Sequence, residues 1–243
     1  VVYLYFHVDV DAEIQSRLVL DAPLHLISPY SQIAMLSLLW QRRLARVYII
    51  GFGGGRIPMV MHHMLPSAHI DCAEIDPDVV DVAKRFFGIA EDERLRVFLK
   101  DGRQTLADMH HSYDIIVVDA FVGLGVGPRV FATMEFFALC RGKLSPHGVV
   151  VVNMLDSDST MHQKRLTIME SFPKVLSVYD RERGNTVLFG CNNGEMTPEL
   201  LAERAKAWGG DYDFQFSLER FAQEATVLYA PVRMFAGLWD RWQ

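Results

Sequence analysis

Basic residues, cysteines and long apolar runs are all scarce in this sequence. Its 243 residues include 24 lysines and arginines against 30 aspartates and glutamates, which gives a formal net charge of −6. Proteins that bind nucleic acid draw much of their affinity from Lys and Arg contacts to phosphates. The charge balance therefore argues against a nucleic-acid partner.

The three cysteines, Cys72, Cys140 and Cys191, are odd in number and lack CxxC spacing. This usage suits a reducing compartment and predicts no zinc site. Adjacent histidines, as at 62–63 and 110–111, point about 100° apart on a helix, so they predict solvated surface rather than a metal centre. We expect no bound metal.

No apolar stretch approaches the roughly 18 to 20 residues that span a bilayer. The longest obvious run, 149–155, contains Asn153. No signal peptide is visible either, so we expect a cytoplasmic protein without a membrane partner. The chain begins at Val1 rather than Met, which leaves open what precedes it.

From Arg46 onward, short β-rich runs alternate with helical patterns, as is typical of parallel βαβ units. The runs expected to form parallel strands are 46–51, 70–75, 95–100, 113–120 and 149–154. Two further runs, 174–180 and 186–190, flank a Gly/Asn turn of the kind that joins antiparallel strands. The order predicts an α/β fold with a doubly wound, mostly parallel seven-stranded sheet. This Rossmann-like layout resembles the class I methyltransferase sheet.

The segments on either side of this core have different patterns. Residues 1–40 predict a short N-terminal β-hairpin followed by a helix that leads into the sheet. Residues 41–195 predict the α/β domain, which we expect to bind a cofactor. Residues 196–243 predict a C-terminal helical extension.

A glycine-rich turn follows the first strand of the sheet and is spelled Gly51-Phe-Gly53-Gly54-Gly55. Glycines let backbone N–H groups approach a ligand closely. A dinucleotide fingerprint needs glycine at position 56, where Arg56 stands, so the spacing favours an adenosyl-sulfonium ligand over NAD. A tight strand-to-helix junction without a ligand uses the same residues. The turn alone therefore does not distinguish a ligand-binding loop from a purely structural junction.

Carboxylates follow three consecutive strands at the point where each strand ends. Glu74 closes the second strand, 23 positions after Gly51, while Asp101 follows the third and Asp119 the fourth. In the crevice at the carboxyl edge of such a sheet, Glu74 is expected to accept ribose hydroxyls and Asp101 an adenine amino group. Each acid alone also suits a helix cap. Together they favour a nucleoside pocket.

The stretch 46–154 resembles the spermidine synthase (polyamine aminopropyltransferase) family. The resemblance is carried by IIGFGGG, AEIDPDVVDVAKRFF, KDGRQTL, YDIIVVDA and FATMEFFALCRGKLSPHGVVVVN, and it extends to LVLDAPLHL and FPKVLSVYDRERGNTVLFG. It implies a transferase that holds decarboxylated S-adenosylmethionine and passes its aminopropyl group to a small-molecule amine, as in polyamine biosynthesis. The product would be methylthioadenosine. It also implies a homodimer.

Matched residue by residue, the resemblance implies a set of cofactor-binding positions: Gly51, Gly53, Gly54, Gly55, Glu74, Ile75, Asp101, Gly102 and Asp119. Glu74 would take the ribose, Asp101 the adenine amino group, and Ile75 would lie against the adenine ring. Asp119 would aim and deprotonate the attacking amine, so it is the expected catalytic residue. The positions assigned to the acceptor are His25, Tyr30, Gln32 and Val122. Of these, Tyr30 and Gln32 suit either the lining of the acceptor cleft or the capping of the entry helix.

Several positions depart from the family's pattern. Members usually carry an aspartate within the glycine loop and a second acid three residues after the strand-four aspartate, but Gly54 and Val122 stand there. A glutamine usual in the N-terminal hairpin is replaced by His25. Without these acids the site loses charge complementarity for cationic amines. With Arg56 beside the loop, we hypothesise that the donor is S-adenosylmethionine itself, which keeps its carboxylate.

Three functions remain open on this basis. The first is an aminopropyltransferase-like enzyme. The second is a methyltransferase that releases S-adenosylhomocysteine, because methyl transfer does not need the amine-binding acids. The third is a cofactor-binding homologue without catalysis, against which Asp119 speaks. The sequence does not identify the acceptor.

The glycine-rich stretch 123–128 predicts a loop over the site that acts as a gate.

Overall fold

The computed structural model describes residues 1–5, 14–121, 127–208 and 214–229. Its centre is an eight-stranded sheet with the strand order β10-β8-β9-β7-β6-β3-β4-β5. Five neighbouring strands are parallel: β3 (Arg46–Ile50), β4 (His69–Glu74), β5 (Leu95–Leu99), β6 (Tyr113–Val118) and β7 (Leu144–Leu155). Three antiparallel strands complete the sheet: β8 (Lys174–Asp180), β9 (Asn185–Cys191) and β10 (Thr226–Leu228).

The predicted fold class is confirmed, with eight strands in the sheet rather than the expected seven. The additional strand, β10, pairs with β8 so that Thr226 faces Ser177. A run of three residues is too short to show the two-residue alternation that marks a strand in a sequence. Strand β7 also begins earlier than expected, because Leu144 pairs with Tyr113 across an irregularity in the ladder.

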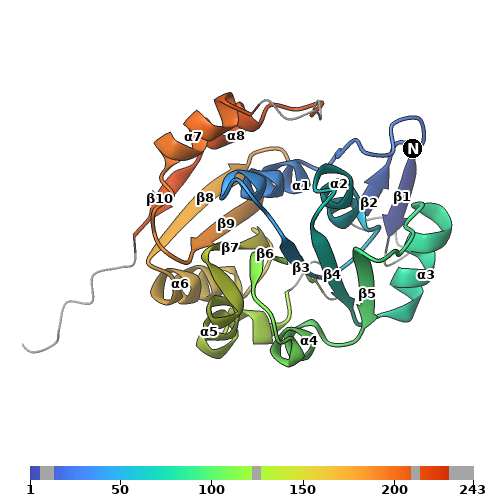
Figure 1. Ribbon diagram of the computed structural model, residues 1–243, viewed down its shortest axis with the longest axis horizontal. Coiled ribbons are helices and arrows are strands. Elements are labelled where there is room, and N and C mark those ends of the chain that lie inside the picture. Colours follow the sequence, from blue (N-terminus) through green and yellow to red (C-terminus); the bar gives the residue numbers. More distant parts are fainter. Residues whose placement is uncertain (6–13, 122–126, 209–213, 230–243) are drawn as a thin grey trace, which may run out of the picture.

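Helices cover both faces of the sheet, as a doubly wound fold requires (Figure 1). On β3, Val47 and Ile49 point into one core, and Tyr48 and Ile50 point into the other. The first face is covered by α1 (Pro29–Ala34), the 3-10 helix η1 (Met35–Leu39), α2 (Arg56–Met64), α3 (Pro77–Phe86), α7 (Pro198–Lys206) and α8 (Leu218–Gln223). The second face is covered by α4 (Gly102–Asp108), α5 (Met134–Lys143) and α6 (Met161–Ser171).

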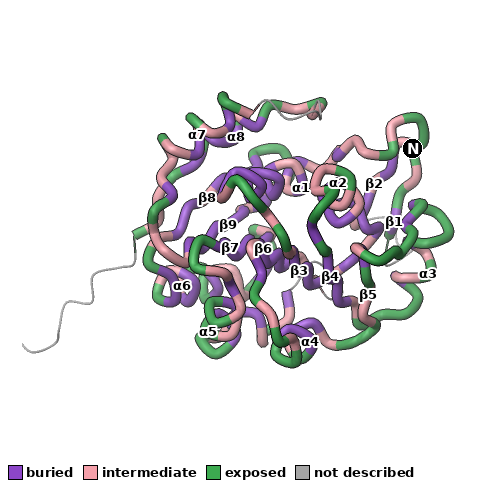
Figure 2. Tube along the Cα trace, viewed as in Figure 1, coloured by how far each residue is buried: buried purple, intermediate pink, exposed green. Residues whose placement is uncertain are grey.

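Burial follows this layering, with the buried residues concentrated along the central strands and the inner sides of the helices (Figure 2). Helices α1 and η1 and helices α7 and α8 contribute to the same core cluster as the sheet. The domain boundaries predicted at 40/41 and 195/196 stay predictions.

All three cysteines are buried and reduced. Within the described ranges, none of the helices combines the length and the apolarity needed to cross a membrane.

A separate two-stranded hairpin precedes the sheet. Strands β1 (Val2–Tyr5) and β2 (Ile14–Leu18) pair antiparallel, as expected. Leu4 and Leu18 of the hairpin pack against Phe87 at the end of α3. This docking brings Ser16 of β2 to the glycine turn after β3, where its hydroxyl accepts a hydrogen bond from the Gly54 N–H at 2.8 Å.

Candidate functional site

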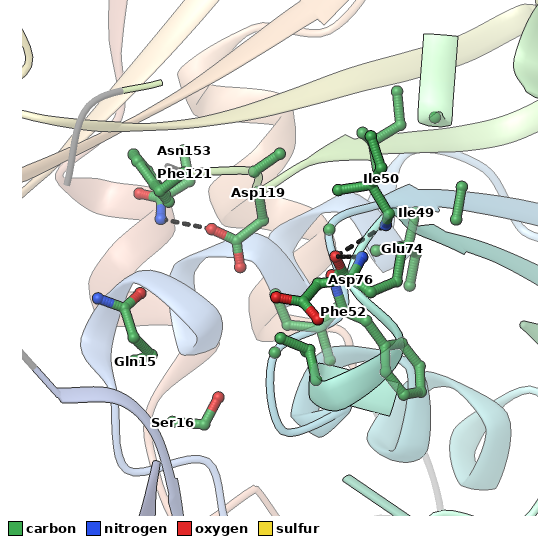
Figure 3. A pocket seen from close by; sticks show the side chains of 18 of the residues that line it. Gln15, Ser16, Ile49, Ile50, Phe52, Glu74, Asp76, Asp119, Phe121 and Asn153 are labelled. Carbon is green, nitrogen blue, oxygen red and sulfur yellow. Dashed lines mark hydrogen bonds between the residues drawn. The ribbon is translucent and has the colours of Figure 1, made fainter. Parts of the chain in front are cut away.

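A cavity of about 1010 Å³ opens at the carboxyl ends of the parallel strands. Clefts of this size hold drug-sized ligands. It is lined from several elements by Ile14, Gln15, Ser16, Tyr30, Ile49, Ile50, Gly51, Phe52, Gly53, Arg56, Ile57, Pro58, Ala73, Glu74, Ile75, Asp76, Val79, Asp101, Gly102, Asp119, Ala120, Phe121, Pro128, Val130, Phe131, Asn153, Leu155, Arg183 and Asn185. Figure 3 shows Glu74 and Asp76 on one side and Gln15, Ser16 and Asn153 on the other, with Asp119 between.

The glycine turn forms one wall of the cavity through Gly51 and Gly53. Gly51 has a φ of 89°, in the region that favours glycine. A Cβ atom added there would lie 2.2 Å from the carbonyl oxygen of Asp119. The turn therefore packs directly against the end of β6, which fixes the glycine wall relative to Asp119.

Gly54 lies behind this wall rather than on it. A Cβ atom on Gly54 would lie 2.7 Å from the ring of Phe87 and 2.8 Å from Cβ of Ser16. The space that a side chain would need is thus filled by α3 and the hairpin. Gly55 is similarly placed, with the Ile89 side chain 2.6 Å from its added Cβ.

Glu74 joins the glycine turn to the turn that follows β4. One carboxylate oxygen accepts a hydrogen bond from the Phe52 N–H at 3.0 Å. The other accepts from the N–H groups of Ile75 and Asp76, at 2.8 and 3.0 Å. Because a carboxylate offers about four lone-pair sites, one acceptor site stays available for a ribose hydroxyl in the cavity.

We expect the variant Glu74→Gln to bind S-adenosylhomocysteine about 10- to 100-fold more weakly. An amide replaces one acceptor oxygen with an NH₂ group, so at least one of the three backbone N–H groups loses its partner. Calorimetric titration measures the effect. The exposed acid Glu93, replaced by Gln, is the control and should bind normally; equal affinity in both variants would contradict the role of Glu74.

The residues predicted at the adenine position, Asp101, Gly102 and Ile75, all line the cavity. Asp101 caps α4 by accepting from the Gln104 N–H at 2.8 Å, so it is both a helix cap and a lining residue. Ile75 is 68% exposed and lines the cavity. An apolar side chain so placed can cover a planar base.

Asp119 lies at the centre of a hydrogen-bonded chain of polar side chains. Its carboxylate accepts from the Asn153 amide at 2.8 Å, and Asn153 in turn accepts from the Asn185 amide at 2.9 Å. The Tyr30 hydroxyl also donates to Asp119. Burial raises the pKa of Asp119 to about 6, although the hydrogen bonds from Asn153 and Tyr30 oppose this rise. Such a pKa suits a general base near neutral pH.

Among the lining residues that were not predicted as site residues are three with polar side chains, Asn153, Asn185 and Arg183. Asn153 interrupts the apolar run of β7, and such an interruption in a strand buried on both faces is the one signal that marks it in the sequence. Asn185 and Arg183 reach the cavity only through the pairing of β9 with β7, in which Asn185 faces Leu155. That register is set by tertiary structure.

The other predicted acceptor residues have different positions. Tyr30 lines the cavity. Gln32 and His25 are not among the lining residues. The Gln32 amide donates to the Leu26 carbonyl at 2.6 Å, and the His25 backbone carbonyl accepts from Arg56 at 3.4 Å. Val122 lies outside the described residues.

Arg56 is a buried cation in the cavity wall, 7% exposed. Its guanidinium donates to the backbone carbonyl of Pro23 as well as to that of His25. It also donates to the sulfur of Met59, at 3.2 Å.

The predicted gate over the site lies largely outside the described residues, at 122–126. Its end is described: the Gly127 N–H donates to the Asp158 carboxylate at 3.2 Å. Asp158 forms a buried ion pair with Lys164 at 2.7 Å, and this pair anchors the chain beside the cavity. In the part of the chain that the structure describes, no group of three or more His, Cys, Asp or Glu side chains is arranged to hold a metal.

Residues 29–177 match the family model described as the spermine/spermidine synthase domain. The chain belongs to this family. It is also 30% identical over 209 residues to a polyamine aminopropyltransferase of Chromobacterium violaceum, a match that covers 84% of this chain and 79% of that protein.

A second group of relatives consists of methyltransferases. An eEF1A lysine and N-terminal methyltransferase of Xenopus laevis is 33% identical over 203 residues, which cover 76% of this chain but only 29% of the relative's length. The crystal structure of human methyltransferase-like protein 13 in complex with SAH has a TM-score of 0.63 at 24% identity, over 86% of this chain and 96% of that chain. The crystal structure of spermidine synthase from Thermotoga maritima has a TM-score of 0.64 at 18% identity, over 82% of this chain and 71% of that chain. The fold is thus shared with both groups, and the relatives of both groups are transferases by name.

Proposed function

We propose that this chain is a transferase that binds S-adenosylmethionine in the cavity and alkylates an amine held at Asp119. The residues fit an adenosyl group, because the backbone of Gly51 and Gly53 lines the cavity without side chains, and Glu74, Ile75 and Asp101 line it beside them. We assign the ribose to Glu74 and the adenine to Ile75 and Asp101. When bound, S-adenosylmethionine supplies an alkyl group activated by the sulfonium.

The observation that carries the donor assignment is the packing around Gly54. An acid that holds the free amine of a decarboxylated donor has no space there, because Phe87 and Ser16 occupy it. The buried cation Arg56 lines the same cavity and favours a donor that keeps its carboxylate. Methyl transfer therefore suits the site better than aminopropyl transfer.

Asp119 handles the proton in this reaction. A protonated amine cannot attack, since its lone pair is occupied. Asp119 accepts that proton, after which the amine nitrogen attacks the methyl carbon and the carbon–sulfur bond breaks, with its electron pair going to sulfur. Asn153 and Tyr30 hold the carboxylate in place through their hydrogen bonds, which supplies the orientation that an in-line displacement requires.

Aminopropyl transfer remains the second candidate, and the family match over 29–177 favours it. In that reaction the amine attacks the aminopropyl carbon and methylthioadenosine leaves. The same Asp119 serves both reactions. What differs is the donor.

Donor binding tests the proposal without knowledge of the acceptor. In calorimetric titrations we expect S-adenosylmethionine to bind at least about tenfold more tightly than its decarboxylated form, in line with one favourable charge contact. Assays with methyl-labelled donor should then give a labelled amine and S-adenosylhomocysteine. Tighter binding of the decarboxylated donor, with release of methylthioadenosine, would establish the second candidate instead. Failure to bind either donor or either product would overturn both.

A further inference from the structure

We propose that the acceptor of this site is a monoamine whose far end is anionic, and that Arg183 contacts this anionic end. The proposal rests on the proposed function, because it concerns the acceptor half of the same cavity. It narrows the small-molecule amine implied by the family resemblance to one class of substrate. Three features of the described residues support it.

The first feature is the shortage of carboxylates around the acceptor. Four acids line the described cavity. Glu74 ends β4, and Asp76 and Asp101 lie in the turns after β4 and β5; all three accept from backbone N–H groups. Asp119 is the fourth. Figure 3 shows the side of Asp119 away from Glu74, where the labelled side chains Gln15, Ser16 and Asn153 are neutral. One carboxylate can neutralise one ammonium group.

The second feature is that Asn153, the neutral side chain bonded to Asp119, already uses its amide in a hydrogen-bonded chain. Asn153 donates to Asp119 and accepts from Asn185, and both asparagines are buried, at 6% and 3% exposure. An ammonium group binds well where carboxylates or free carbonyl oxygens surround it. Here the amide oxygen of Asn153 already has a partner, so a second ammonium would find little compensation for its lost hydration.

The third feature is the cation at the rim of the cavity. Arg183 lies in the turn between β8 and β9, two residues before Asn185, and it lines the cavity with an exposed side chain. One oxygen of Asp180 accepts from the Glu182 and Arg183 N–H groups, and Asp156 accepts from the Tyr179 hydroxyl. Glu182 is exposed on the same turn as Arg183. None of these three acids lines the cavity. A guanidinium so placed repels a second ammonium and pairs well with a carboxylate or phosphate.

Three amines of the same four-carbon length test this directly. Putrescine, butylamine and 4-aminobutanoate present a positive, a neutral and a negative far end to the same cavity. With S-adenosylmethionine as donor and S-adenosylhomocysteine release as the readout, we expect kcat/KM to rise in that order, by roughly three- to tenfold at each step. Cadaverine and 5-aminopentanoate repeat the charge comparison with one more carbon, so that an amine long enough to span from Asp119 to Arg183 is included.

The variant Arg183→Glu tests whether the charge of Arg183, rather than another feature of the cavity, causes the preference for amines with an anionic far end. It should reverse the order, so that putrescine becomes the better substrate and 4-aminobutanoate the worst. Arg181 belongs to the same turn, is exposed and is not among the lining residues, so Arg181→Glu serves as the matched control and should keep the original order. Because both positions lie on an exposed turn, both variants should fold, and binding of S-adenosylhomocysteine checks that they do.

The outcomes are distinct from those that test the proposed function. A preference of the unmodified protein for putrescine would overturn the acceptor assignment while leaving the transferase intact. The same holds if Arg183→Glu and Arg181→Glu change the order equally. No transfer to any of these amines, with normal binding of S-adenosylhomocysteine, would contradict the proposed function itself.

Discussion

Replacement of Asp119 by Asn is expected to lower kcat/KM for amine alkylation by about 10²- to 10⁴-fold, the range usual for loss of a general base. The asparagine has nearly the same shape and can still accept from Asn153, so the cavity should keep its form. Affinity for S-adenosylhomocysteine should therefore change little. Asp156 follows β7 much as Asp119 follows β6 but does not line the cavity, so Asp156→Asn is the matched control.

The pH dependence of the reaction gives a second readout for Asp119. Burial raises its pKa to about 6, so the carboxylate is deprotonated above that pH and protonated below it. We expect kcat/KM of the unmodified protein to fall as the pH drops through about 6, whereas the residual rate of the Asp119→Asn variant should lack this step. An unchanged profile in the variant would show that another group acts as the base.

The same pKa shift predicts that the variant is more stable than the parent. A carboxyl group whose pKa is raised on folding, from 3.8 to about 6, contributes stability below pH 3.8, and this contribution is lost as the pH rises through 6. At pH 8 the folded protein therefore bears the cost of the ionised Asp119, at most about 3 kcal/mol. Asp119→Asn should raise the melting temperature at pH 8 and have little effect at pH 3.8 or below. A lower melting temperature at pH 8 would contradict the cost of burying this charge.

Much of this site follows from the sequence because it depends on strand order alone. Parallel strands end at one edge of a sheet, so Glu74, Asp101 and Asp119 had to meet there once the βαβ pattern was recognised. For Asp101, the role of helix cap does not exclude a position in the cavity wall. Its carboxylate accepts from Gln104 and also lines the cavity.

The features that sequence reasoning could not supply depend on contacts between distant segments. Asn185 meets Asn153 only because β9 pairs with β7 in one register. The missing acid at Gly54 was visible in the sequence, but its physical meaning was not. Only the docking of the hairpin and α3, which places Ser16 and Phe87 against Gly54, shows that the acid has no space there.

The glycine turn carries the second large effect. Gly51→Ala is expected to lower the free energy of unfolding by at least about 3 kcal/mol and to weaken binding of S-adenosylhomocysteine by more than about 100-fold. The alanine would combine a strained φ of 89° with a contact of 2.2 Å to the Asp119 carbonyl oxygen. To relieve that contact the glycine turn must move away from the end of β6. This movement would separate the glycine wall of the cavity from Asp119.

Gly88→Ala provides the matched control for this effect. Gly88 also has a positive φ, 71°, but nothing lies within 4 Å of an added Cβ. This variant should lose only the backbone penalty, roughly 1–2 kcal/mol, and should bind S-adenosylhomocysteine normally. Urea unfolding and calorimetry compare the two variants, and the difference between them measures the contact alone. If Gly51→Ala lowers the free energy of unfolding no more than Gly88→Ala does, the turn can move without loss of stability. The contact between the glycine turn and Asp119 would then not be what positions the donor relative to Asp119.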